Sequence, residues 1–258
     1  MRANRWVLLA ASALLAVQAN AAPCRAHSGP RTAALVELYT SEGCSSCPPA
    51  ERWLSTFDAG GGGRVVPLAL HVDYWDGLGW KDPYAQHAFA LRQRRLADLA
   101  GERFVYTPQV LLQGRDFRAW DGPAFEAEVK RINAGAPGAA LGLALRWAHG
   151  AMAEVEVRAT LLERAQQADA ALYFATYQDG LTSVVAAGEN RGRTLRHDYV
   201  VRDWIGPLGF GRTPELTERR RLRPPPGAAP GRWGVAAFVQ NRRNSRVLQA
   251  LLLPACAR

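Results

Sequence analysis

Cys44 and Cys47 are the residues of this sequence whose spacing most clearly points to a chemistry. Thiols separated by two residues can close a small disulfide and reopen it. Pro48 follows directly, and proline is accepted only in the first turn of a helix, so the sequence places the pair at a helix start. The helix dipole there favours a thiolate on the first sulfur. The chemistry indicated is thiol–disulfide exchange.

The two remaining cysteines, Cys24 and Cys256, stand near the ends of the chain. Because chain termini often lie close together, we predict a structural disulfide between them. Closing so long a loop stabilises a protein by at most about 5 kcal/mol. Two free or intermolecular thiols are the alternative. A zinc site is not expected, since zinc would need a second closely spaced ligand pair.

The first residues predict export. Arg2 and Arg5 precede an apolar run at 6–17 and a small-x-small cleavage site at 19–21, which together are typical of a signal peptide covering residues 1–21. An uncleaved anchor is the alternative, although the run is short for a membrane span of roughly 20 residues. We expect a periplasmic or secreted protein with no membrane span after cleavage. The formal charge of +9 falls to about +7 once Arg2 and Arg5 are removed, and this excess suits an anionic envelope better than nucleic acid.

Strand-like and helix-like segments alternate through residues 22–136 and predict an α/β domain. Apolar runs predict strands, spacing of three and four residues predicts helices, and proline after aspartate predicts helix starts. The expected elements are a strand at 33–39, a helix after Cys47, a strand at 65–70, a helix from Asp82, a strand at 105–112 and a helix from Asp121.

After a Gly/Pro-rich linker at 135–138 the pattern becomes short alternating strands, which predict an antiparallel β-sandwich-like domain over 139–258. One expected strand is 194–201. The segment 219–226 is rich in arginine and proline and is expected to be a loop.

Three segments carry a family resemblance. The runs 36–51, 71–80 and 105–109 resemble the motifs of a bacterial secreted family, domain of unknown function 1223. The resemblance covers nearly the whole exported chain. It implies a thioredoxin-like fold for residues 22–136, and the family's name itself leaves the activity open.

The resemblance implies roles around the sulfurs. Cys44 would be the nucleophile and Cys47 the resolving thiol, with hydroxyls of Ser45 and Ser46 beside the sulfur and the substrate. Glu37, in the preceding strand, would accept the proton from Cys47. A surface position for Glu37 is the alternative.

Thr107 and Pro108 resemble the Thr–cis-Pro pair that faces the CxxC in such folds, where the backbone can bind a peptide as an added strand. A trans proline at an edge strand is the alternative. Trp75 and Tyr106 would form an aromatic rim for substrate, with core packing as the alternative. His197, followed by Asp198, is interpreted as a sandwich loop contact.

Two functions follow. The first is a thiol–disulfide oxidoreductase that acts on protein thiols or disulfides of the cell envelope, without a cofactor or metal. The second is an envelope binding module that keeps the Cys44–Cys47 disulfide only as a structural link. Copper capture by the reduced dithiol is a weaker third hypothesis.

Overall fold

The computed structural model describes residues 24–58, 63–148, 152–229 and 231–256. The predicted signal peptide, residues 1–21, lies outside this part of the chain. Among the helices within it, none has the length and apolar character needed to cross a membrane.

The first half of the described chain alternates strands and helices, with a parallel pair β2–β3 and an antiparallel pair β2–β4. The elements are β1 (Cys24–His27), β2 (Ala34–Thr40), α1 (Pro48–Leu54), β3 (Val65–His71), a 3-10 turn η1 (Asp76–Leu78), α2 (His87–Ala100), β4 (Gln109–Leu112), β5 (Arg115–Asp116) and α3 (Pro123–Ala134).

The second half is built almost wholly from strands. They are β6 (Ala139–Trp147), β7 (Ala153–Leu161), β8 (Ala170–Gln178), β9 (Leu181–Val184), β10 (Thr194–His197), β11 (Val200–Gly209), β12 (Glu215–Leu222), β13 (Trp233–Asn241) and β14 (Val247–Pro254), with a 3-10 turn η3 (Arg164–Gln166).

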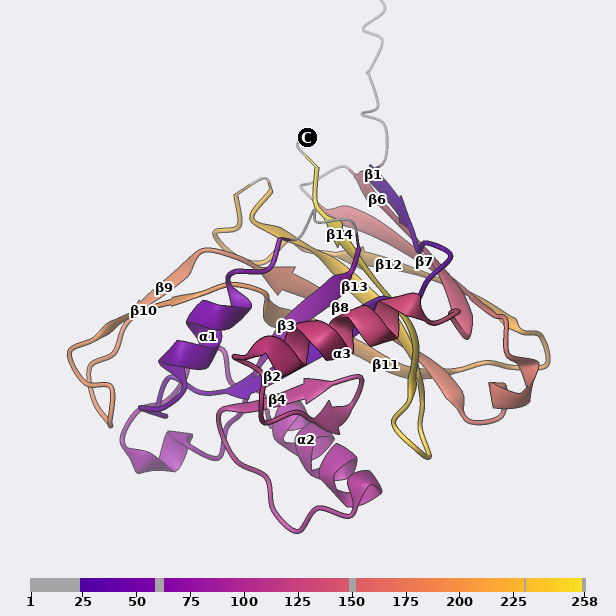
Figure 1. Cartoon of the computed structure of the whole chain (residues 1–258). Coiled ribbons are helices and arrows are strands. Elements are labelled where there is room, and N and C mark those ends of the chain that lie inside the picture. The colour runs from indigo at the N-terminus through magenta and orange to yellow at the C-terminus, as the bar shows by residue number, and fades with distance from the viewer. Residues whose placement is uncertain (1–23, 59–62, 149–151, 230, 257–258) are drawn as a thin grey trace, which may run out of the picture.

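One mixed sheet of eight strands runs through both halves, in the order β14-β13-β8-β11-β3-β2-β4-β5. The halves meet where β11 pairs in parallel with β3, at Val200 and Ala69. A four-stranded antiparallel sheet, β1-β6-β7-β12, and the β9–β10 pair complete the fold. The predicted boundary near residue 137 therefore separates two patterns of elements that share one sheet (Figure 1).

Helices cover both faces of the sheet around β2 and β3 (Figure 1). The side chains of β2 alternate between the faces, as the pleat requires. Val36 and Leu38 pack with α1 and α3, whereas Leu35 and Tyr39 lie on the opposite face with α2. This alternation decides which side chains can reach the cysteine pair.

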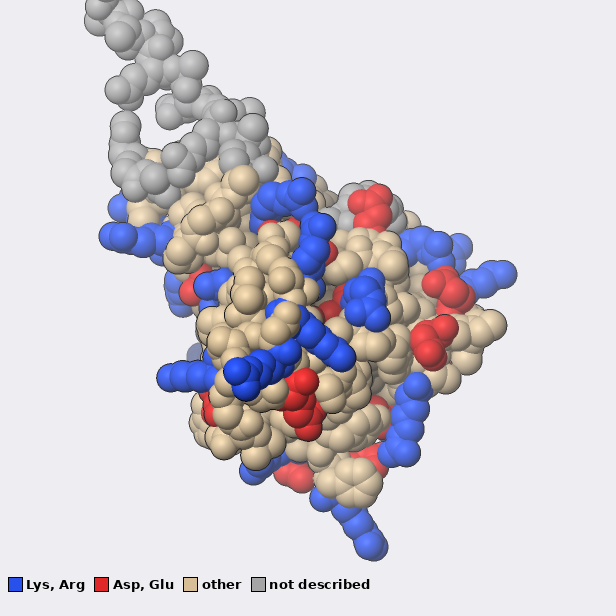
Figure 2. Space-filling view, turned by 90° about the vertical axis from the view of Figure 1, so that its left-hand side faces the viewer, with Lys and Arg blue, Asp and Glu red and all other residues tan. Residues whose placement is uncertain are grey.

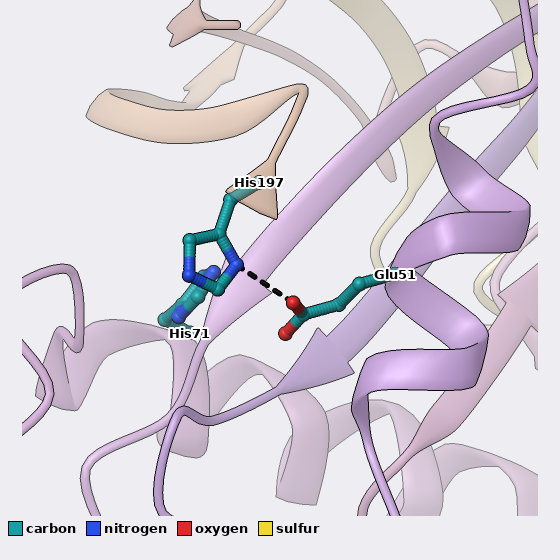
Figure 3. A group of neighbouring side chains, drawn as sticks. All are labelled: Glu51, His71 and His197. Atoms are coloured by element: carbon teal, nitrogen blue, oxygen red, sulfur yellow. Dashed lines mark hydrogen bonds and ion pairs between the residues drawn. The ribbon is translucent and has the colours of Figure 1, made fainter. Parts of the chain in front are cut away.

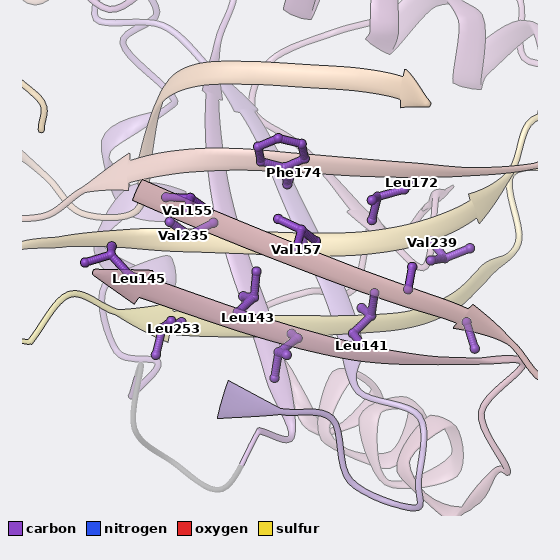
Figure 4. Close-up of a cluster of buried hydrophobic side chains, with 14 of the residues drawn as sticks. Leu141, Leu143, Leu145, Val155, Val157, Leu172, Phe174, Val235, Val239 and Leu253 are labelled. Atoms are coloured by element: carbon purple, nitrogen blue, oxygen red, sulfur yellow. The ribbon is translucent and has the colours of Figure 1, made fainter. Parts of the chain in front are cut away.

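The β-sandwich core lies between the four-stranded sheet and strands β8, β13 and β14 (Figure 4). Leu143 and Val157 of the small sheet pack toward Phe174 and Val235 of the large one. Cys24 and Cys256 form the disulfide that the sequence predicts, with Cα atoms 5.9 Å apart. It ties β1 to the chain end after β14.

The segment expected to be a loop at 219–226 is in part a strand, so that prediction is wrong for residues 219–222. β12 is an edge strand paired with β7. An edge strand can carry charged side chains because one of its sides faces solvent. Here Arg219 donates to Glu156 (2.6 Å) and Arg221 to Glu154 (3.0 Å). Figure 2 shows basic side chains spread over one face of the molecule with acidic ones among them.

Candidate functional site

Cys44 and Cys47 form a disulfide between the end of β2 and the start of α1, with Cα atoms 5.4 Å apart. Cys47 is the N-cap residue of α1, and its backbone N–H donates to the carbonyl of Cys44 (3.2 Å). Both cysteines are fully buried, whereas Ser45 and Ser46 between them are exposed. In this oxidised, closed arrangement neither sulfur faces solvent.

The segment 185–193, which joins β9 to β10, contacts the backbone of the CxxC turn. The buried Asn190 donates its side-chain N–H groups to the carbonyls of Glu42 (2.8 Å) and Cys44 (3.0 Å). Glu189 accepts a hydrogen bond from the backbone N–H of Ser45 (3.0 Å), and hydrogen bonding by the side chain and the backbone of Ser45 lowers the pKa of Glu189. A segment about 145 residues later in the chain thus closes the CxxC turn.

Trp75 links the CxxC turn to the proline that the resemblance singled out. The Thr107–Pro108 peptide bond is cis, the isomer that the family resemblance implies. Trp75 Nε1 donates to Thr107 Oγ1 (2.8 Å), and a Cβ on Gly43 would lie 3.2 Å from Trp75 Cβ. Trp75 therefore packs closely against Gly43, the residue before Cys44, and is hydrogen-bonded to Thr107.

Tyr106 belongs to a shallow aromatic hollow beside the cis proline. It is half-buried, and its hydroxyl donates to Asp116 (2.9 Å). Burial and this carboxylate raise the pKa of Tyr106 to about 12. The hollow has a volume of about 340 Å³ and is lined by Phe104, Tyr106, Pro108, Arg118 and Trp120.

Glu37 is fully buried, so the alternative of a surface position for this residue is wrong. Arg92 of α2 donates to both of its carboxylate oxygens (2.7 and 3.1 Å). In the alternation of β2, Glu37 lies with Leu35 and Tyr39 on the face opposite α1. A role as proton acceptor for Cys47, which begins α1, does not fit this placement.

A different buried network lies on the α1 face of the sheet. His197 of β10 contacts Glu51 of α1 through Nδ1 (2.6 Å) and Glu42 of the CxxC turn through Nε2 (3.0 Å). Burial alone would lower the pKa of His197, but the two carboxylates outweigh it and raise the value to about 10. Glu51 also accepts from the Thr40 hydroxyl (2.5 Å), and Glu42 accepts from Trp80 Nε1 (2.7 Å).

His71, at the end of β3, joins this network from below (Figure 3). Its Nδ1 lies 2.7 Å from Asp82 Oδ2, while its Nε2 is buried without a partner. Asp82 also accepts from the backbone N–H groups of Glu42 (2.8 Å) and Tyr84 (2.8 Å). Attraction to His71 and these bonds lower the pKa of Asp82 to about 2, although burial opposes the shift. The prediction of a helix starting at Asp82 is therefore wrong. Asp82 binds His71 and two backbone N–H groups, and α2 begins at His87.

The structure therefore brings together residues that the sequence analysis treated separately. His197, interpreted as a loop contact, lies in a strand and is 1% exposed beside the CxxC turn. One signal was present in the sequence: a histidine in a second-half strand and acids flanking the CxxC. Nothing in their spacing indicated that they would meet.

Comparison with known proteins places the chain in a family. The family model described as protein of unknown function (DUF1223) matches residues 35–240, and the chain belongs to this family. No curated protein matches the sequence.

Solved structures share the fold at low sequence identity. The X-ray structure of protein AGR_C_4864 from Agrobacterium tumefaciens has a TM-score of 0.62 and 23% identity, covering 88% of this chain and 96% of that one. HBP35 of Porphyromonas gingivalis has a TM-score of 0.64 and 14% identity, covering 87% of this chain and 75% of that one. These likenesses concern the fold alone.

Proposed function

We propose that the protein is an exported, thioredoxin-like thiol–disulfide oxidoreductase that exchanges disulfides with envelope proteins through Cys44 and Cys47. The observation that carries the proposal is the placement of the CxxC disulfide between β2 and α1, joined through Trp75 to the cis Thr107–Pro108 bond. The order of elements from β2 to α3, with β2 and β3 parallel and β4 antiparallel, agrees with such a domain. Two disulfides suit an oxidising compartment, periplasmic or secreted.

The proposed exchange transfers two electrons, and the substrate is bonded to the protein only in the intermediate mixed disulfide. In the reduced protein, the Cys44 thiolate attacks one sulfur of a substrate disulfide and releases the other as a thiolate. Cys47 then attacks Cys44 in the mixed disulfide, which frees the substrate dithiol and restores the Cys44–Cys47 bond. Run in reverse, the same steps oxidise a substrate dithiol.

Substrate would enter over Ser45, Ser46 and the aromatic side chains. The two serines are exposed, and Trp75 and Tyr106 are half-buried on the side of Thr107–Pro108. An extended peptide could pair with the backbone there as an added strand. Because Glu189 and Asn190 hold the CxxC turn closed, reaction requires this segment to move away. Glu37 has no part in the proposal, since Arg92 engages both of its oxygens.

Complete burial of both cysteines favours a second candidate, a binding module in which the disulfide is structural. Reactivity separates the two functions. An exchange-active bond should have a reduction potential above about −300 mV, whereas a structural bond lies below it.

The test is a trap in the exported protein. In Cys47→Ser, Cys44 cannot be released from a mixed disulfide, so we expect partner proteins attached to Cys44 on non-reducing gels and in mass spectra. Cys44→Ser is the matched control and should capture far fewer partners. Equal capture by both variants, or none by either together with a potential below −300 mV, would establish the structural disulfide instead.

A further inference from the structure

Three buried side chains from distant parts of the chain point ligand atoms at one another. One ligand atom each from Glu51, His71 and His197 lies within 4.8 Å of the other two. They come from α1, β3 and β10, and Figure 3 shows the carboxylate of Glu51 turned toward His197, with His71 next to that imidazole. All three residues are at most 5% exposed.

The atoms that would not bind an ion already have partners. His71 Nδ1 contacts Asp82 (2.7 Å), His197 Nε2 contacts Glu42 (3.0 Å), and the second oxygen of Glu51 accepts from Thr40. Histidines that bind metals almost always donate their other ring N–H to a carboxylate or carbonyl, which fixes the tautomer and orients the ring. Both histidines here have that support.

The remaining atoms are left facing inward. His71 Nε2 is fully buried and has no hydrogen-bond partner among the described residues, and His71 belongs to the group that meets Glu51 and His197. A buried polar atom without a partner is destabilising, so its retention calls for an explanation. A ligand at the common point supplies one.

The local charge also favours a cation. Among the described residues, the ion pairs of Glu42, Glu51 and Asp82 are all with the two histidines. Three buried carboxylates thus depend on two imidazoles for compensation, and even two imidazolium charges would leave one negative charge. A divalent cation bound by two neutral imidazoles would leave the same net charge of one negative unit, and neither ring would then need an extra proton.

From this geometry we infer a metal site in which Glu51, His71 Nε2 and His197 Nδ1 bind one divalent transition-metal ion of the zinc type. Two histidines and a glutamate are a known zinc donor set, and imidazole and carboxylate suit that class of ion. Zinc bonds of about 2.0–2.1 Å require ligand atoms roughly 3.3 Å apart in a tetrahedron, which side-chain rotations can provide from the observed spacing. Binding displaces the proton between His197 and Glu51.

The inference does not depend on thiol chemistry. The site would tie β10 to α1 next to the CxxC turn, because Glu42 and Glu51 flank the cysteines in sequence. It would therefore stabilise the closed position of the β9–β10 hairpin, whether or not the disulfide reacts.

The test uses the exported chain with both disulfides intact, so that no thiolate can bind the ion. Protein freed of metal by a chelator is titrated with Zn²⁺ by calorimetry, and bound zinc is counted by elemental analysis. His71→Asn is the informative variant, because the shorter amide can still donate to Asp82 while Nε2 is removed. His87→Asn is the matched control, since His87 contacts Asp73 at an exposed position on α2.

We expect one Zn²⁺ per chain, a loss of affinity of at least 100-fold in His71→Asn, and no change in His87→Asn. Co²⁺ added to the unmodified protein should give the visible absorption of a tetrahedral nitrogen and oxygen site, a readout that needs no variant. The inference is overturned by binding below one ion per chain, by equal affinity in His71→Asn and the unmodified protein, or by a Co²⁺ spectrum like that of the hydrated ion.

Discussion

Two groups of buried ionisable side chains lie on opposite faces of the eight-stranded sheet, and their charges are balanced differently. On the α2 face, Glu37 and Arg92 form one ion pair with two hydrogen bonds, and the guanidinium lies 4.9–5.2 Å from three aromatic rings. On the α1 face, Glu42, Glu51 and Asp82 share two histidines, one of which keeps a nitrogen without a partner.

Both groups are buried, so burial does not distinguish a structural ion pair from a candidate functional site, whereas the balance of charge does. The Glu37–Arg92 pair has one charge of each sign, and Arg92 also donates to Gln240 (2.9 Å), so the buried charges of the pair compensate each other. The α1-face group has more carboxylates than imidazoles and lies beside the Cys44–Cys47 disulfide. Unbalanced buried groups of this kind cluster at functional sites.

The largest expected effect comes from breaking the balanced pair. Arg92→Met keeps the apolar stem but leaves the Glu37 carboxylate buried without its cation, which should lower the free energy of unfolding by about 3–5 kcal/mol. Denaturation in urea measures the change. The double variant Glu37→Met, Arg92→Met removes both charges and should recover most of the loss. If the single variant lost less than about 1 kcal/mol, or the double variant recovered nothing, Arg92 would not be needed to compensate the buried charge of Glu37.

The sequence predicted those features of the fold that depend on nearby residues. The CxxC turn, α3 from its Asp-Gly-Pro start and the cis Thr107–Pro108 bond all follow from local residue types or a motif. The pairing of Cys24 with Cys256 followed because the other two cysteines are adjacent.

The features that the sequence analysis missed depend on contacts between distant segments. The strand expected at 194–201 is broken after His197, because Tyr199 has a φ of 58° and its N–H donates to Asp179 (2.8 Å). That break turns β10 onto α1 and places His197 beside the CxxC. The buried Asn190 donates to the carbonyl of Cys44, and no local pattern indicates a contact across 146 residues.

Asp179 is a third case, a partly buried carboxyl group whose desolvation is not fully compensated by a cation. Burial raises its pKa to about 6, despite the hydrogen bond from Tyr199. Between about pH 4 and pH 6 the folded carboxyl holds a proton that the unfolded chain has lost, so stability falls as pH rises through this window. Asp179→Asn cannot ionise, so above pH 6 it should exceed the unmodified protein by about 1–3 kcal/mol.

Urea denaturation at pH 4 and pH 7 checks this expectation. The advantage of Asp179→Asn should appear at pH 7 and vanish at pH 4, while the exposed Asp98→Asn on α2 should change neither value. An equal advantage at both pH values would mean that the change acts through packing and not through ionisation.

The smallest effect on stability should come from the contact that closes the CxxC turn. Asn190→Ala removes two hydrogen bonds to the carbonyls of Glu42 and Cys44, which should cost about 1–2 kcal/mol. Because those bonds hold the segment 185–193 against the CxxC turn, the same change should speed reduction of the disulfide by dithiothreitol about tenfold, the factor that corresponds to about 1.4 kcal/mol. Thr182→Ala, on the exposed side of β9, is the control and should leave the rate unchanged. An unchanged rate in Asn190→Ala, with the expected loss of stability, would show that the α1-face network holds the sulfurs closed by itself and that the hairpin only rests on it.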